Sequence, residues 1–358
     1  MQSKKIQDQQ LTVASVILTT LDEVLKNDSS TLLFGLGVND PKGVFGTTTD
    51  LYKKYTTNRV FETPTSENAM TGVGVGLALA GFKPIMVHQR LDFFLLAMDQ
   101  LVNNAAKWHF MFGGESTVSL TIRLIVGRGW GQGPTHSQNL HAWFAHIPGL
   151  KVVIPAFASD VKGLLTSAIR DPNPVIFIED RWIHSQLVEI NELKDEVPLG
   201  VANLVTTGND LTIVSSGYMS VLALQAVTYA KRKGVQIDLI DLRTIKPLDE
   251  KMILESVKKT GRLMVVDSGV EFSSFGAYVI SRISSYAFDY LELAPKLLAS
   301  LDIPEPTSHG VIEEFKITAT KIAGTIFEML NLEKPDDLIL ELRSHHHDVP
   351  DPFFTGPF

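Results

Sequence analysis

Short, nearly continuous runs of Val, Ile and Leu alternate with segments of helical period along most of this chain. Strands without a polar face are expected where helices cover both sides of a parallel sheet. The runs lie at Thr31–Leu36, Pro84–His88, Leu120–Val126, Val152–Pro155, Pro174–Glu179, Leu211–Ser215, Gln236–Asp241 and Leu263–Asp267. The predicted helices lie at Asp92–Phe112, Ser159–Arg170, Ser220–Gly234, Asp249–Gly261 and Glu313–Leu330. The alternation predicts an α/β chain with largely parallel sheets flanked by helices.

The alternation is lost between Trp182 and Thr207, where the sequence becomes polar and acidic, and it restarts at Asp210. We therefore predict a first domain over residues 1–185, a linker over 186–209 and a second domain over 210–332. Residues 333–358 form a Pro- and His-rich C-terminal tail. The run His345–His347 is interpreted as solvated, because three adjacent histidines of regular structure cannot all face one metal ion.

Composition excludes several classes of function. The net charge is −8 without a block of Lys or Arg, which argues against a nucleic-acid or anionic-membrane surface. The absence of cysteine rules out disulfides and thiolate nucleophiles. Met1–Lys5 is followed by polar sequence, and no segment is apolar for long enough to span a bilayer. A cytoplasmic location is the expectation.

Two glycine-rich segments resemble nucleotide-binding motifs only superficially. Gly72–Gly76 follows a helix start at Thr65–Glu67, so its glycines fall inside a helix and favour close packing rather than a dinucleotide. Gly127–Gly133 follows a strand but lacks the Gly-Lys-Ser/Thr ending of a phosphate loop. We interpret it as a loop that carries Arg128 and Trp130 towards a site.

Eight stretches in order along the chain resemble the beta subunit of the decarboxylating component of pyruvate and branched-chain 2-oxo acid dehydrogenases. They are Thr63–Glu67, Asp99–Lys107, Ser119–Arg123, His136–Gln138, Trp143–Pro155, Lys162–Leu165, Ile169–Pro174 and Asp241–Pro247. The resemblance implies a pyrimidine-binding (transketolase-like) domain followed by a transketolase C-terminal-type domain. It also implies thiamine diphosphate at an alpha–beta boundary, an α2β2 heterotetramer with a beta–beta contact, and magnesium held by a Gly-Asp-Gly motif of the alpha subunit. This chain has no Gly-Asp-Gly, so a partner is needed to hold the cofactor.

The same resemblance assigns roles near the cofactor. Glu67 matches the carboxylate that activates the aminopyrimidine, whereas without the resemblance it is a first-turn acid favoured by the helix dipole. His136 matches a histidine that stabilises adducts and moves protons, and the alternative is a structural loop histidine. Phe93 matches an aromatic that packs on the pyrimidine, or is a core residue, and Gln89 matches a neighbouring cofactor-side residue.

A potassium site is implied more weakly. Leu120, Ala168, Asp171 and Asn173 match a loop that binds potassium in some relatives, largely through backbone carbonyls. The alternative is a helix-ending turn at Asp171–Pro174.

Four residues depart from the family pattern on the expected substrate side: His88, Arg90, Arg128 and His141. A cation here can pair with a phosphate or a second carboxylate of the substrate. Arg90 can equally be solvated or paired with Asp92.

The function that the resemblance implies is oxidative decarboxylation of a 2-oxo acid, with acyl transfer to a lipoyl acyltransferase partner and with an alpha subunit required for activity. One alternative is the beta-type half of a split transketolase or carboligase that acts on ketose and aldose phosphates, which the extra cations favour. Another is a subunit that retains the fold after losing catalysis, which the presence of Glu67 and His136 disfavours.

Overall fold

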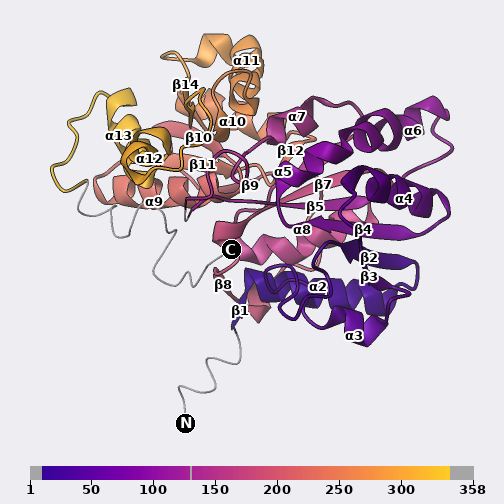
Figure 1. Cartoon of the computed structure of the whole chain (residues 1–358). Helices are drawn as coiled ribbons and strands as arrows, with labels where there is room; N and C mark the ends of the chain where they lie inside the picture. The colour runs from indigo at the N-terminus through magenta and orange to yellow at the C-terminus, as the bar shows by residue number, and fades with distance from the viewer. Residues whose placement is uncertain (1–9, 130, 339–358) are drawn as a thin grey trace. The chain divides into compact units, whose positions relative to one another are not determined.

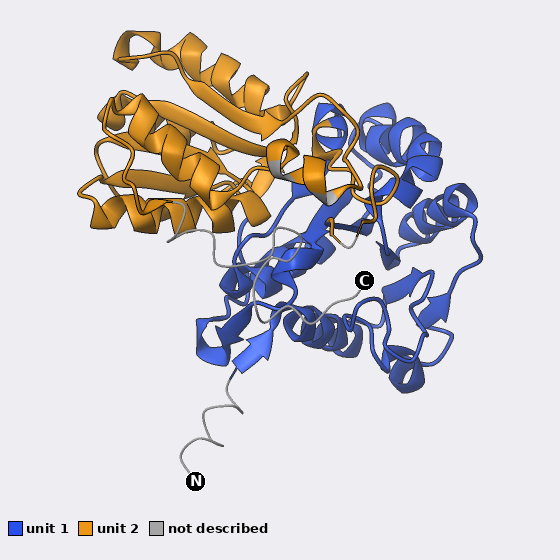
Figure 2. Ribbon diagram, turned by 60° about the vertical axis from the view of Figure 1, so that its left-hand side comes forward, with its two compact units in different colours: residues 1–127, 143–199, 355–358 blue, residues 128–142, 200–354 orange. Residues whose placement is uncertain are grey.

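The computed structural model describes residues 10–129 and 131–338. Within these, the chain forms two compact units, and Figure 2 colours them separately. Unit 1 contains residues 10–127 and 143–199, and unit 2 contains residues 128–142 and 200–338. The expectations for Met1–Lys5, Trp130 and His345–His347 concern residues outside those described.

Unit 1 is built on a parallel sheet. Its strands are β2 (Thr31–Gly35), β3 (Val60–Glu62), β4 (Lys83–His88), β5 (Thr121–Val126), β6 (Lys151–Val153) and β7 (Val175–Asp180). They run side by side in the order β6-β7-β5-β4-β2-β3, and every neighbouring pair is parallel. Every residue of β2 and β5 is buried, as the continuous apolar runs predict.

Helices cover both faces of this sheet (Figure 1). The longer ones are α2 (Val13–Asn27), α4 (Glu67–Leu79) and α8 (Ala158–Arg170), and the short ones are α3 (Leu51–Tyr55), α7 (His141–His146), η3 (Arg181–Ile183) and η4 (Ile190–Glu192). Helices α2 and α8 pack together, while α4 packs on β4. The glycines of residues 72–76 lie inside α4, as predicted, and a Cβ at Gly74 would meet Phe34 at 3.3 Å.

The predicted single helix over residues 92–112 is broken into four segments. They are α5 (Leu91–Phe94), the 3-10 turn η1 (Leu95–Ala97), the π-helical segment η2 (Gln100–Ala105) and α6 (Ala106–Met111). Side-chain amides bond within the π segment, since Asn103 donates to Asp99 at 2.7 Å and Asn104 donates to Gln100 at 3.1 Å. Periodicity alone does not distinguish such a segment from a regular helix.

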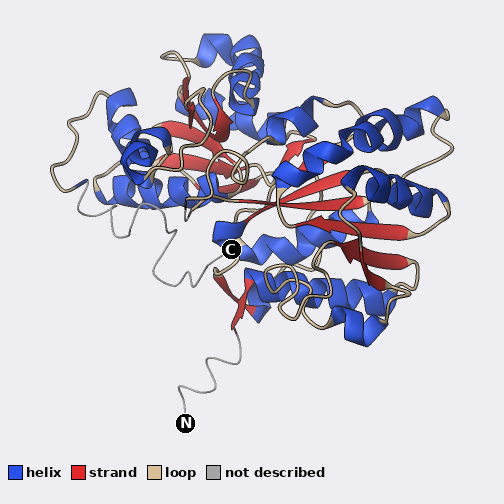
Figure 3. Ribbon diagram, viewed as in Figure 1, coloured by secondary structure: helices blue, strands red, loops and turns tan. Residues whose placement is uncertain are grey.

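Unit 2 has a second, mixed sheet in the order β14-β13-β10-β11-β9. Figure 3 draws the strands in red. Its strands are β9 (Asn203–Thr206), β10 (Leu211–Ser215), β11 (Ile237–Asp241), β13 (Leu263–Val270) and β14 (Lys296–Ser300), and the short β12 (Thr244–Lys246) follows β11. All neighbours are parallel except β9, which runs antiparallel to β11. The α/β prediction is thus confirmed for both units.

The helices of unit 2 are α9 (Tyr218–Arg232), α10 (Glu250–Thr260), α11 (Phe275–Ala287), η5 (Phe288–Tyr290), α12 (His309–Phe315) and α13 (Ala319–Met329). Helix α10 shows why they form where they do. The side chain of Asp249 accepts from the Met252 N–H at 3.1 Å at the first turn, and Gly261 ends the helix at φ +69°.

Two parts of the predicted domain layout fall differently in the structure. Residues 128–142, predicted inside the first domain, cluster with unit 2. The polar stretch predicted as a linker carries regular structure, because β8 (Leu187–Glu189) pairs antiparallel with β1 (Gln10–Thr12) and β9 is an edge strand of unit 2. Within residues 10–129 and 131–338, no helix is both long enough and apolar enough to cross a membrane.

A buried ion pair lies inside the sheet of unit 1. Arg123 of β5 donates from Nε to Glu179 Oε1 at 2.5 Å and from Nη2 to Oε2 at 2.9 Å, and it also bonds Thr47. Arg123 is in register with Phe177, so Glu179, two residues further along β7, projects from the same face. Burial raises the pKa of the Glu179 carboxyl, but the charge of Arg123 and the hydrogen bonds from His184 and Arg123 together lower it more, so that the pKa is about 2.

Candidate active site

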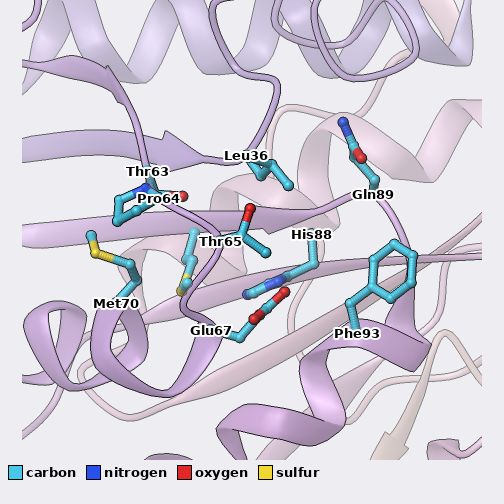
Figure 4. A pocket seen from close by; sticks show the side chains of 10 residues that line it. Leu36, Thr63, Pro64, Thr65, Glu67, Met70, His88, Gln89 and Phe93 are labelled. Carbon is cyan, nitrogen blue, oxygen red and sulfur yellow. The ribbon is translucent and has the colours of Figure 1, made fainter.

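A small pocket opens at the carboxyl edge of β2, β3 and β4 in unit 1. In open α/β sheets, ligands bind outside the carboxyl ends of the strands. The walls combine apolar and polar side chains: Leu36, Thr63, Pro64, Thr65, Glu67, Met70, Met86, His88, Gln89 and Phe93. Figure 4 shows them converging from the strand ends and from α4.

Glu67 is the first residue of α4, and its side chain is half-buried. Ser66, the residue before it, makes no side-chain cap bond, so the free N–H groups of the helix start favour a nearby negative charge. The carboxylate reaches the pocket rather than bulk solvent alone (Figure 4). The pocket therefore contains a carboxylate beside apolar walls. A carboxylate is the group that can hold a proton at a nitrogen of a bound ring.

His88 ends β4 and lies on the floor of the same pocket. Its side chain is only 7% exposed and packs edge-on against the ring of Phe94, with centroids 4.9 Å apart. Burial lowers the pKa of His88 to about 4, so its imidazole is neutral near pH 7. Nε2 is buried and has no hydrogen-bond partner among the described residues.

The two neighbouring phenylalanines of α5 have different environments. Phe94 is fully buried and packs against His88 and Phe144, whereas Phe93 is half-buried and lines the pocket. The aromatic surface that faces the pocket is therefore Phe93. Gln89 also lines the pocket, but Figure 4 shows its amide directed away from the carboxylate of Glu67. That amide fits close to Gly37, where an added Cβ would lie 2.4 Å from Nε2 of Gln89.

Arg90 follows His88 by two residues and is buried beside the ends of β4, β5 and β7. Its Nη1 donates to the carbonyl of Gly127 at 3.2 Å, and its guanidinium lies 5.9 Å from the ring centroid of Phe45. Arg181 lies over the same ring at 5.0 Å. Burial lowers the pKa of Arg90 to about 10, against the opposing charge of Asp92. Arg90 is thus cationic at neutral pH, and it is not among the residues that line the pocket.

Three candidates belong to unit 2. Nε of Arg128 lies 3.8 Å from Oε1 of Glu305, which is a long distance for an ion pair. His136 is partly exposed, and its Nδ1 is 2.9 Å from the hydroxyl of Thr135. His141 is buried and its Nε2 is 2.8 Å from Asp267 Oδ1. His141 is thus a buried side chain held by Asp267, and its role on the substrate side stays a prediction.

The predicted potassium ligands lie together at the end of α8. The carbonyls of Leu120, Ala168 and Asp171 accept bonds from Val175 N, Thr121 Oγ1 and Ser119 Oγ at 3.0, 3.1 and 2.8 Å. The carboxylate of Asp171 is occupied by the ammonium of Lys151 and by the Asn173 N–H. Asn173 Oδ1 is buried without a partner among the described residues. A cation at this turn would therefore be held by carbonyl oxygens, and the Asp171 side chain is already neutralised.

Six of the ten residues that line the pocket were not singled out from the sequence. Leu36, Met70 and Met86 have side chains without chemical function. Thr63, Pro64 and Thr65 entered only as members of the family-like stretch Thr63–Glu67. The signal that could have found them is positional, since Leu36 directly follows β2 and Thr63 directly follows β3. In the described ranges, no group of three or more His, Cys, Asp or Glu side chains is placed to hold a metal ion.

Two family models match consecutive parts of this chain, and the first of them includes residues 128–142. Residues 9–183 match the family model of the transketolase pyrimidine-binding domain, and residues 200–322 match that of the transketolase C-terminal domain. A solved structure described as a split gene transketolase, inactive beta4 tetramer, superposes with a TM-score of 0.72 over 90% of this chain and 99% of that chain. Its sequence identity is 19%, so this likeness concerns the fold alone.

Curated relatives are more similar in sequence. The pyruvate dehydrogenase E1 component subunit beta of Rickettsia bellii is 38% identical over 83% of this chain and 91% of that protein. The subunit of the same name from Rhizobium meliloti is 39% identical, and this chain spans 65% of its length. The beta subunit of acetoin:2,6-dichlorophenolindophenol oxidoreductase from Cupriavidus necator is 36% identical over 88% of this chain and 96% of that protein.

Proposed function

This chain belongs to the transketolase-type family that includes the pyruvate dehydrogenase E1 beta subunits, and on that premise we propose that it is the beta subunit of a thiamine-diphosphate-dependent 2-oxo acid dehydrogenase. With an alpha subunit it would decarboxylate a 2-oxo acid and pass the acyl group to a lipoyl acyltransferase. The observation that carries the proposal is the carboxylate of Glu67 in a pocket at the carboxyl edge of a pyrimidine-binding-type domain.

The residues of the pocket fit the aminopyrimidine half of thiamine diphosphate. The ring is flat, and Phe93 with Met70 and Met86 offers apolar surface for its faces. When bound, the cofactor supplies the carbon nucleophile and the electron sink that decarboxylation requires. Glu67 would hold a proton at a nitrogen of the ring, and the surrounding walls would exclude water from that hydrogen bond.

The other candidates have supporting roles in the proposal. His136 would hold and move a proton on the substrate side, for which an imidazole is suited near neutral pH. Magnesium and the diphosphate group are assigned to the alpha subunit, because this sequence has no Gly-Asp-Gly. Potassium at the turn of Leu120, Ala168, Asp171 and Asn173 and a cytoplasmic location both stay predictions.

Exposed apolar side chains support a partner subunit. Between the start of η1 and the residue that follows α6, Leu96 is 68% exposed and Phe110 is 90% exposed, and Met111 and Phe112 are exposed as well. Clustered large apolar side chains on a surface mark contacts with other proteins. We assign surfaces of this kind to the alpha subunit and to a second beta subunit of an α2β2 assembly.

The test is an activity assay of the reconstituted complex. Purified alpha and beta subunits are incubated with thiamine diphosphate, magnesium and a panel of 2-oxo acids, and reduction of an artificial electron acceptor is followed. The proposal expects turnover of at least one 2-oxo acid with both subunits and none with either alone. Glu67→Gln should abolish this turnover while leaving assembly intact, because the amide keeps the shape but not the charge.

A second candidate is oxidation of acetoin, because the Cupriavidus necator relative is named an acetoin:2,6-dichlorophenolindophenol oxidoreductase and this chain matches 96% of its length. Acetoin therefore belongs in the substrate panel. Ketose and aldose phosphates belong there too, since turnover of sugars alone would favour a split transketolase over the dehydrogenase.

A further inference from the structure

His88 places a second titratable side chain in the pocket of Glu67. Among the ten residues that line the pocket, these are the only two with ionisable side chains. Figure 4 shows the imidazole and the carboxylate directed into the same space from β4 and from the start of α4. The pocket therefore offers both members of a hydrogen-bonded pair.

Nε2 of His88 is unusual among the polar atoms of the pocket because its hydrogen bond is missing. It is buried and has no hydrogen-bond partner among the described residues, although buried polar atoms are usually satisfied. A buried donor without a partner destabilises a structure, so such an atom is expected where a bound group supplies the missing acceptor. The groups of the pocket that could accept from it are few, and Glu67 is the one that carries charge.

We propose that His88 is a positioning residue, which donates a hydrogen bond from Nε2 to the carboxylate of Glu67 when a ring ligand closes the pocket. The inference rests on the proposed function, because the ligand is the aminopyrimidine whose nitrogen takes the other carboxylate oxygen. The imidazole then carries its proton on Nε2. With one oxygen held by His88, the other is fixed towards the ring.

A neutral donor suits this task better than a cation. A Lys or Arg beside Glu67 would favour the ionised carboxylate and weaken its hold on a proton shared with the ring. Burial keeps His88 uncharged down to a pKa of about 4, so it directs the carboxylate without an ion pair. The edge-on contact with Phe94 fixes the plane of the imidazole, which is what a positioning role requires.

The experiment measures cofactor binding by the assembled alpha–beta complex. Thiamine diphosphate with magnesium is titrated by calorimetry into the wild-type complex and into complexes with His88→Leu, His88→Gln and Glu67→Gln, and the double variant His88→Leu/Glu67→Gln. The proposal expects His88→Leu to weaken binding about tenfold or more, as for loss of a hydrogen bond to a charged group. His88→Gln, which keeps a neutral donor, should bind within about threefold of wild type on the same scale.

The double variant shows whether His88 acts through Glu67. If it does, His88→Leu should change affinity by less than about threefold once Glu67 is glutamine, since the energies of coupled residues are not additive. Equal losses in both backgrounds, or wild-type affinity in His88→Leu, would overturn the inference. Thermal denaturation and gel filtration of each complex separate binding from folding, and His88→Met replaces His88→Leu if the leucine complex does not assemble.

Failure of the proposed function gives a different result. A wild-type complex that does not bind thiamine diphosphate refutes the function itself. A wild-type complex that binds, that loses affinity on Glu67→Gln and that is indifferent to His88→Leu refutes the positioning role alone.

Discussion

Nε2 of His141 lies 2.8 Å from Oδ1 of Asp267, and both side chains are buried within unit 2. The same carboxylate accepts from the N–H groups of Gly269 at 2.9 Å and Gly276 at 2.7 Å. Burial raises the pKa of Asp267, but His141 and these backbone hydrogen bonds together lower the pKa by more, so the net shift is downwards. One carboxylate thus joins residues 128–142 to β13 and to the start of α11.

Replacing His141 by leucine should lower the free energy of unfolding by about 3 kcal/mol, since breaking a buried pair leaves an uncompensated charge. Because two backbone N–H groups still donate to Asp267, we expect a loss of stability at the lower end of what breaking a buried ion pair usually costs. His141→Gln retains an N–H donor and should lose clearly less. Urea denaturation of the full chain measures both, and equal stabilities of wild type and His141→Leu would refute the anchoring role.

Arg123→Met should destabilise the chain by about 3–5 kcal/mol, because Glu179 would remain buried without its cation. The double variant Arg123→Met/Glu179→Leu should recover much of this loss, since an apolar pair of similar volume is tolerated where an unpaired charge is not. Denaturant unfolding provides the measurement. A double variant less stable than Arg123→Met would contradict the expectation.

The buried neutral state of His88 predicts a dependence of stability on pH. Its pKa is lowered from 6.5 to about 4, so the unfolded chain binds a proton that the folded chain does not between these values. The contribution of His88 to stability is therefore complete above pH 6.5 and falls as the pH drops towards 4. His88→Gln lacks this loss, so the wild type should lose up to about 3 kcal/mol more than the variant across that range. Urea denaturation at several pH values compares the two, and parallel stability curves would contradict the prediction.

Gly149 lies shortly after α7 where the backbone packs closely, and Gly81, which lies after α4, is a matched control. Gly149 has φ +93°, and a Cβ there would lie 1.8 Å from the carbonyl oxygen of Ala106. Gly81 has nearly the same φ of +91°, but nothing lies within 4 Å of its Cβ position. Gly81→Ala should therefore cost only the backbone strain of about 1–2 kcal/mol, and Gly149→Ala should cost distinctly more. Similar melting temperatures for the two variants would argue against the close contact.

Sequence patterns predicted the α/β class because buried parallel strands require continuous apolar residues, and β2, β5 and β10 have them. The π-helical segment inside the predicted helix over residues 92–112 could not be predicted from the sequence. The side-chain hydrogen bonds of Asn103 and Asn104 leave the apolar period unchanged. Arg123 inside an apolar strand gave no hint of its partner, since Glu179 lies 56 residues away. Residues 128–142 cluster with unit 2, and one contact there joins His141 to Asp267, which lies 126 residues away.

The candidate site was predictable only in part. Glu67, Gln89 and Phe93 came from family resemblance, and the structure brings them to one pocket. Polarity at His88 was noted, but its burial and its unmet Nε2 depend on how β4 ends beside Phe94. The burial of His141 against Asp267 was likewise not visible from the sequence.

The most direct test of the account is the structure of the assembled alpha–beta complex with thiamine diphosphate and magnesium. The account predicts the aminopyrimidine ring in the pocket of β2, β3 and β4, with a ring nitrogen within about 3 Å of the Glu67 carboxylate, as for a hydrogen bond. A cofactor bound in the complex with its ring away from Glu67 would contradict it.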